Sequence, residues 1–291
     1  EFAGSYPQVL GTLEKYPSGR GDPRKIIPYM SGDQSFISPI MSNPENVFQL
    51  GPNAYAKPAT ALNILRETIM GRDLFDYAFK TYSKRWIFKH PTPEDFFRTM
   101  EDASAVDLDW FWRGWFYTTD VVDIGINSFK KYSISTTPGT QVKELIENYD
   151  MSSEDMSPSV YMEEEKDDQT INKLREDRLK VLEEYLKENN NESKIPKYFY
   201  EIGFEKPGGI VMPIIVKYSY ADGTSDLVRY PVQLWRKNID QVYKVITSDK
   251  EIIEVTLDPD LETSDININN NNWPRKEIKS KFKLFKNKIK G

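Results

Sequence analysis

The sequence predicts a multi-domain α+β protein, in which a helical subdomain is followed by a small antiparallel β-sandwich. Two observations predict this class. Apolar side chains recur at helical spacing between residues 53 and 117, and at a spacing of two between residues 196 and 257. The 291 residues, 38% hydrophobic and 13% aromatic, suffice for one large domain or two ordinary ones.

Four segments follow from changes in composition along the chain. We expect a helical part over residues 1–125, an acidic connecting segment with a surface helix over 126–195, the β-sandwich over 196–262, and an Asn-rich, basic tail over 263–291. The first 50 residues are rich in Gly, Pro, Ser and Asn. They predict a long loop or one wall of a cleft, with a short helix beginning within Phe36–Met41.

The helical part contains start and stop signals for four helices. Asn53 is the expected N-cap of the first helix and Gly71 its end. Thr92 is the expected N-cap of the third helix, with Asp95 as the acid of a capping box. The helices are expected over residues 54–70, 73–86, 93–102 and 108–116.

The second half of the chain alternates between charged and β-rich stretches. Ten Asp or Glu lie between Glu144 and Asp168, which indicates a solvated segment, and helical spacing returns over residues 171–186. The dipeptide Asp222-Gly223 predicts a hairpin turn. Strands are expected over residues 128–135, 197–202, 211–220, 227–234, 242–246 and 252–257.

The counts exclude several classes of function. A net charge of −6 and a pI near 5.2 argue against general nucleic-acid binding. The absence of cysteine excludes disulfides and thiolate metal sites. Zinc sites need two or more His or Cys ligands, so the single histidine, His90, favours a surface or hinge residue. With no starting Met and no signal peptide, we expect the chain to be part of a longer protein.

Three blocks of the helical part carry a resemblance to a known family. The blocks are GPNAYAKPA at residues 51–59, RWIFKHPTPEDFF at 85–97 and DLDWFWRGWF at 107–116. With these blocks the chain resembles the C-terminal part of the catalytic region of aminopeptidase N-like zinc metallopeptidases, the gluzincins, in their bacterial form. The order and spacing of the blocks agree over about Tyr55–Asp123. A weaker resemblance covers WRKN at 235–238, LDP at 257–259 and NNWP at 271–274.

The resemblance implies a mechanism and a role for one tyrosine. In this family a zinc held by a His-Glu-x-x-His helix and a later Glu polarises a water that attacks a peptide carbonyl. A tyrosine hydroxyl stabilises the oxyanion, and by residue match this tyrosine is Tyr55. A neutral phenol can donate a hydrogen bond there without adding charge. We assign no substrate-binding residue.

The sequence departs from the family at the metal site. It contains no His-Glu-x-x-His, so we expect no metal ligand and no activity in this chain alone. Zinc and the N-terminal catalytic half would belong to the parent protein, as would binding of the peptide substrate. The resemblance also favours aminopeptidase specificity and a location in the periplasm or cell envelope.

Other interpretations of individual residues remain open. Lys57 either pairs with a carboxylate or lies on the surface, and we interpret it as structural. The aromatic run favours core packing over a substrate pocket, and Asp107 and Asp109 favour N-cap acids over a catalytic pair. Asp258, Asp260 and Asp265 lack the spacing and glycine of a calcium loop. The run comprises Trp110, Phe111, Trp112, Trp115, Phe116 and Tyr117.

The rival function is a non-catalytic scaffold or interaction module derived from a degenerate peptidase. The tail over residues 275–291, with eight Lys or Arg and one Glu, could bind an anionic membrane or a partner, or could be a solvated helix.

Overall fold

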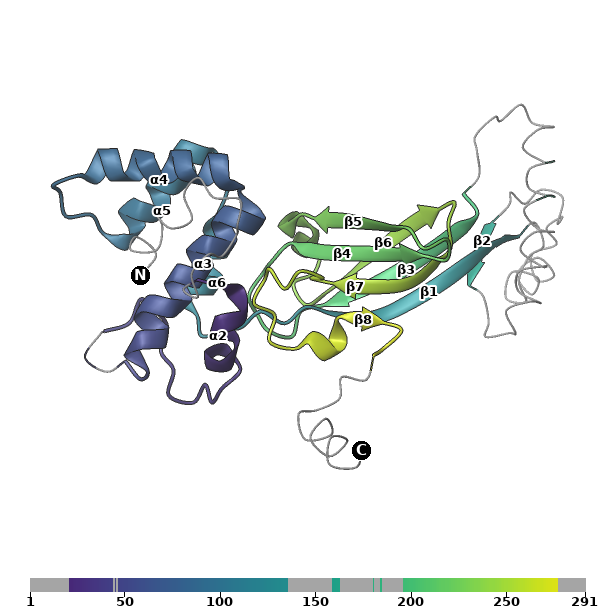
Figure 1. The fold of residues 1–291 in the computed structure, drawn as a ribbon, viewed down its shortest axis with the longest axis horizontal. Coiled ribbons are helices and arrows are strands. Elements are labelled where there is room, and N and C mark those ends of the chain that lie inside the picture. Colours follow the sequence, from purple (N-terminus) through teal and green to yellow (C-terminus); the bar gives the residue numbers. More distant parts are fainter. Residues whose placement is uncertain are drawn as a thin grey trace, which may run out of the picture.

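The computed structural model describes residues 21–43, 45, 47–135, 159–162, 180, 184 and 196–276. Helices gather at one end of the molecule and two antiparallel sheets at the other, which makes the protein elongated (Figure 1). The protein therefore belongs to the mixed α+β class, as the change of periodicity predicts.

All four expected helices are present. The first is continuous but changes type, because a π-helical turn precedes an α-helix and a second π-helical turn follows it. The helical elements are α2 (Pro23–Met30), η2 (Gly51–Ala56), α3 (Lys57–Ile64), η3 (Leu65–Ile69), α4 (Arg72–Trp86), α5 (Pro93–Ser104) and α6 (Asp109–Tyr117).

The first 50 residues were predicted less well. Helix α2 lies where only a loop or cleft wall was expected, and its N-terminus is capped by the Asp22 side chain, which accepts from Arg24 N. Proline is common both in loops and at the first position of a helix, and Pro23 occupies the first position of α2. The short helix expected within Phe36–Met41 is wrong, since this stretch forms turns and Phe36 is exposed.

The caps of α5 and α6 differ in how well the sequence predicted them. The capping box of α5 is confirmed, because Thr92 Oγ1 accepts from Asp95 N and Asp95 Oδ2 accepts from Thr92 N at 2.9 Å. The N-cap role expected for Asp107 and Asp109 is wrong. Leu108 is the N-cap residue of α6, and the Glu101 carboxylate accepts from its backbone N–H at 2.8 Å.

In the described part of the chain, eight strands form two four-stranded antiparallel sheets, in the orders β2-β1-β3-β6 and β5-β4-β7-β8. Strands β1, β2 and β8 come from outside the predicted sandwich segment 196–262, so the sheets draw on residues to either side of it. The strands are β1 (Gly125–Ser135), β2 (Ser159–Met162), β3 (Tyr198–Glu205), β4 (Ile214–Tyr220), β5 (Ser225–Tyr230), β6 (Gln241–Ser248), β7 (Ile252–Leu257) and β8 (Asn272–Trp273).

The hairpin between β4 and β5 follows the sequence signal at its turn, but the strand after it is shorter than expected. Gly223 adopts φ 82°, a conformation that glycine reaches without strain. Strand β5 ends at Tyr230 rather than continuing to residue 234. Pro231 has no N–H for a ladder bond, and the 3₁₀-helix η5 (Val232–Arg236) follows it.

Both sheets contribute side chains to one hydrophobic core, which continues into the helical part. Most residues of β4 are buried, and β3 buries Tyr200, Ile202 and Phe204 at a spacing of two. At the junction, Val121 N donates to Gly208 O at 2.8 Å, and Ser264 Oγ donates to Pro23 O at 2.9 Å. The core members that span the two parts include Phe75, Phe111, Trp115, Tyr200, Val216 and Val255.

Three predictions lie largely or wholly outside the described residues. These are the acidic segment 144–168 apart from β2, the amphipathic helix over 171–186 apart from residues 180 and 184, and the basic tail beyond Lys276. Within the described part of the chain, no helix has the length and apolar character to cross a bilayer.

Candidate functional site

Tyr55, the residue singled out by sequence, lies on the π-helical turn η2. Pro58 has no N–H, and its ring would collide with the carbonyl of Ala54 in an α-helical turn. The turn is instead widened, and Lys57 N donates to Pro52 O, five residues back. Single π-helical turns are rare and are found frequently at functional sites.

The Tyr55 side chain faces solvent, with 51% of its surface exposed. No described residue forms a hydrogen bond with the Tyr55 hydroxyl. A phenol in this position is free to donate one hydrogen bond to a ligand that approaches the turn.

Asn53 fixes the turn from inside the protein. Its side-chain amide is buried and donates to Tyr29 Oη at 3.0 Å and to Ser38 O at 2.7 Å. These bonds hold η2 against α2 and the loop that follows it. The role of N-cap predicted for Asn53 is wrong, because the helix already begins at Gly51.

Lys57 fixes the turn on its other side. The side chain is only 3% exposed, and its Nζ donates to Thr118 O at 3.3 Å, in the connection between α6 and β1. Burial lowers the pKa of Lys57 to about 8, and the attraction of Asp120 offsets part of this shift. Lys57 therefore carries its charge in an apolar setting, and the surface position considered for it is wrong.

An apolar surface adjoins the turn. Phe48 and Leu50, which directly precede η2, are each about half exposed, and the Phe48 ring lies 6.2 Å from that of the exposed Phe36. Isolated exposed apolar residues are ordinary, but several in one loop region commonly mark a surface that another protein segment covers.

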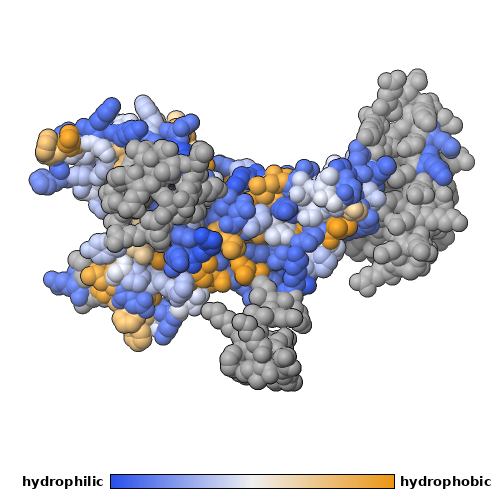
Figure 2. Space-filling view, in the orientation of Figure 1, coloured by the Kyte–Doolittle hydropathy of each residue, from blue (hydrophilic) through white to orange (hydrophobic). Residues whose placement is uncertain are grey.

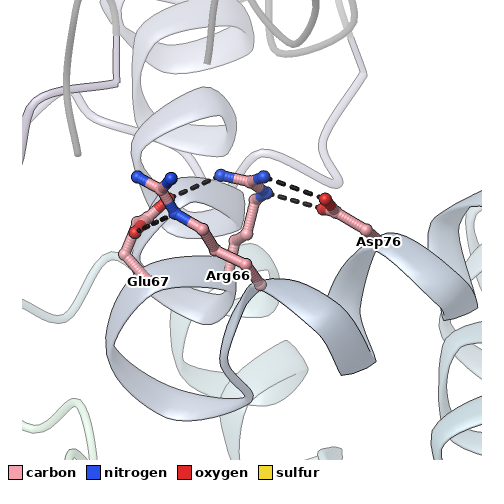
Figure 3. Close-up of polar contacts among 4 residues, drawn as sticks. Arg66, Glu67 and Asp76 are labelled. Atoms are coloured by element: carbon pink, nitrogen blue, oxygen red, sulfur yellow. Dashed lines mark hydrogen bonds and ion pairs between the residues drawn. The ribbon is translucent and has the colours of Figure 1, made fainter. Parts of the chain in front are cut away.

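At the far end of the same helix, a network of charges is buried (Figure 3). Arg66, 1% exposed, donates two bonds to the Asp76 carboxylate at 2.6 and 2.9 Å and a third to Glu67 Oε1 at 2.6 Å. Arg72 Nε contacts both oxygens of Glu67 at 3.0 Å. Forked Arg–carboxylate pairs are geometrically specific, so this network fixes the helix against the start of α4.

Two hollows lie near the aromatic helix α6, and Tyr55 lines neither. The first, about 440 Å³, lies between α5 and α6, and the second, about 530 Å³, lies between the helical part and η5. Trp112 and Tyr117 line the first and Trp110 the second, whereas Phe111, Trp115 and Phe116 are core residues. Core packing thus accounts for most of the aromatic run.

The sequence did not single out Glu101, which lines the first hollow and caps α6. Desolvation raises the pKa of its carboxyl group. No motif marks this residue, because its role depends on the packing of α5 against α6.

The acidic residues near the C-terminal end of the sheets serve as hydrogen-bond acceptors. Asp258 accepts from the backbone N–H groups of Glu262 and Thr263, at 2.7 and 3.0 Å. Asp265 accepts from Asn267 N and from the Asn271 amide, and burial raises its pKa to about 6. These contacts give both carboxylates a structural role.

In the part of the chain that the structure describes, the side chains that could ligate a metal ion are dispersed. Across the described ranges, no three His, Cys, Asp or Glu side chains are grouped so that they could hold an ion. The buried carboxylates are engaged by N–H donors, and His90 lies exposed in the α4–α5 connection.

Comparison with known proteins gives no match, either to a protein-family model or to a curated protein.

Proposed function

We propose that this chain is the C-terminal part of a zinc-dependent metallopeptidase of the aminopeptidase N-like family, with its helical part completing the active-site cleft and a β-sandwich following it. The observation that carries the proposal is the Tyr55 hydroxyl. It is half exposed, lies on a π-helical turn, and has no partner among the described residues. The three sequence blocks around and after it support the same family.

Tyr55 acts as a hydrogen-bond donor to the oxyanion that develops when a peptide carbonyl is attacked. Such a donor is effective when it is held in place before the reaction, so that little reorganisation is needed. Asn53 and Lys57, buried on either side of it in sequence, supply that rigidity through Ser38 O, Tyr29 Oη and Thr118 O.

The chain supplies no zinc ligands, and no step of the proposal runs through the metal. The family resemblance assigns zinc, the general base and the residues that hold the substrate amino terminus to an N-terminal half. This half would be the main partner of the chain and would cover the apolar loop around Phe48 and Leu50. The proposed chain is inactive by itself.

The decisive experiment replaces Tyr55 with Phe in the longest natural form of the protein. We expect kcat to fall by about 10²- to 10³-fold, the usual loss for one oxyanion donor, with zinc content unchanged. Tyr77→Phe is the matched control, since Tyr77 is also exposed on the helical part. Unchanged turnover in Tyr55→Phe would refute the assignment.

A second measurement separates the peptidase from the rival scaffold. Zinc content and aminopeptidase turnover are compared between this chain and its longest natural form. We expect both only in the longer form. A longest form with neither zinc nor turnover would instead support the non-catalytic interaction module.

A further inference from the structure

The connection between α4 and α5 forms the outer end of the helical part, away from the sheets (Figure 1). The last residue of α4 and the first three residues of this connection, Trp86–Lys89, make a tight turn that we call the tip turn. Lys89 N donates to Trp86 O at 2.9 Å, which closes it.

The tip turn has the geometry of a type II turn with an unusual residue at its third position. Ile87 has φ −53° and ψ 130°, and Phe88 has φ 59°. This turn type requires a positive φ at its third residue, where glycine or asparagine is usual. A phenylalanine is strained there, because its Cβ crowds the neighbouring carbonyl.

The strained residue is also fully exposed. Phe88 has 99% of its surface in solvent, and Ile87 beside it has 60%. Figure 2 shows apolar surface at this end of the helical part. Phe88 makes no ring contact with another described residue. Its side chain therefore does nothing for the stability of this fold, while its backbone is under strain.

Cations flank the exposed pair. Lys84 and Lys89 are both exposed, and neither has a carboxylate partner among the described residues. Lys89 Nζ lies 5.8 Å from the centre of the Trp86 ring, which keeps this charge close to the turn. Both charges are therefore available to an external anion.

Three carboxylates of α5 have partners of their own. Asp102 pairs with Arg85 at 3.2 Å, Asp95 closes the capping box of α5, and Glu94 accepts from the Tyr117 hydroxyl at 3.0 Å. The tip turn presents two apolar side chains, flanked in sequence by two lysines that have no carboxylate partner among the described residues.

We propose that the tip turn docks on an anionic membrane surface, with Ile87 and Phe88 inserted at the level of the acyl chains and Lys84 and Lys89 paired with headgroup phosphates. A stable protein interface needs about 800 Å² from each partner, which two projecting side chains do not provide. A lipid layer closes around a single projecting ring, and the end position of the turn lets a flat surface approach. This docking is weak, reversible and independent of the proposed peptidase activity.

The first test uses the full chain with Phe88→Gly, which removes the ring and relieves the strain. We expect its thermal stability to be at least that of the parent chain. Its partition onto vesicles of phosphatidylglycerol and phosphatidylcholine, measured by co-sedimentation, should fall at least tenfold. Phe36→Ser removes an exposed aromatic elsewhere on the helical part and should leave partition unchanged. Equal partition of Phe88→Gly and the parent chain would overturn the proposal.

A second test separates the tip turn from the basic tail, which is present in every variant. The chain has no cysteine, so one introduced cysteine carries an environment-sensitive fluorophore alone. We expect labelled Phe88→Cys to shift to shorter wavelength with anionic vesicles and not with pure phosphatidylcholine. The same label at Tyr243→Cys, exposed on β6, should not respond. No shift at position 88 would refute docking through this turn and leave a protein partner as its explanation.

Discussion

In the helical part, the buried charge of Arg66 is balanced by the opposite charges of Glu67 and Asp76, whereas in the β part the buried Asp258 and Asp265 are balanced by N–H donors. An ion pair in an apolar setting depends on both partners, because either charge alone is costly to bury. A carboxyl group bound by neutral donors is less constrained, since it can take up a proton and remain in place.

Lys57, at the junction of the two parts, resembles neither case. Among the described residues, the backbone carbonyl of Thr118 is the acceptor of its ammonium, and Asp120 raises its pKa by electrostatic attraction. From this comparison we expect the free energy of unfolding to fall steeply when one partner of the Arg66 network is removed. The pH-dependent part of the stability should come instead from Lys57 and Asp265, whose pKa values lie at about 8 and about 6.

The largest expected effect is in the Arg66 network. Arg66→Met removes the forked partner of Asp76 and one of the two arginines that contact Glu67, and should lower the free energy of unfolding by about 3–5 kcal/mol. Chemical denaturation of the full chain measures it. Arg85→Met, which breaks an exposed pair with Asp102, should cost under about 1 kcal/mol. If both variants lost the same free energy of unfolding, burial would not explain a difference between the Arg66 network and the Arg85–Asp102 pair.

Lys57→Met should stabilise the chain at pH 7. The folded chain holds the Lys57 proton only below about pH 8, whereas the unfolded chain holds it up to the ordinary lysine pKa of 10.5. Stability therefore rises with pH between these values, by about 3 kcal/mol at 1.36 kcal/mol per pKa unit. Lys57→Met removes this slope. The variant also loses the hydrogen bond to Thr118 O, which is worth about 1 kcal/mol. The net gain in the free energy of unfolding at pH 7 is therefore about 2 kcal/mol.

Unfolding free energies of both proteins from pH 7 to pH 10 test this. The difference between them should shrink toward high pH, while tyrosine ionisation affects both proteins alike. A constant difference would mean that Lys57 is not the titrating group.

Local signals in the sequence predicted the regular elements well. The capping box of Thr92 and Asp95 located the start of α5, and the period-two pattern located β7 at its observed residues. Asp222-Gly223 located a hairpin, because its glycine reaches φ 82°. Each of these signals depends on residues close together in sequence.

Contacts between distant residues were not predictable in the same way. Lys57 is buried by Thr118, 61 residues later, and Asn53 is turned inward by Tyr29 and Ser38. Nothing adjacent to Lys57 or Asn53 indicates this packing. The candidate site rests on one residue, Tyr55, that resemblance singled out; the rigid surroundings that would make it effective emerge only from the fold.

A titration effect of similar size is expected for Asp265, and its sign is opposite to that of Lys57. The folded chain binds a proton at Asp265 below about pH 6, while the unfolded chain binds it only below 3.8. Stability from this group therefore falls as pH rises from about 4 to 6, by about 2–3 kcal/mol. Asp265→Asn lacks this titration. Its amide donates to Asn271 Oδ1, which is buried without a partner in the described structure, once the Asn271 side chain turns over, and the bond from Ile124 N at 3.4 Å is lost.

Urea denaturation at pH 4 to 7 should show the parent chain losing stability relative to Asp265→Asn as pH rises. Asp260→Asn, which removes an exposed carboxylate from the same loop, should change stability by less than about 0.5 kcal/mol at every pH. If the parent chain and Asp265→Asn kept a constant difference, the Asp265 carboxyl would be charged throughout. Its N–H donors would then compensate buried charge as fully as the ion pairs of the helical part, and the contrast between the two parts would disappear.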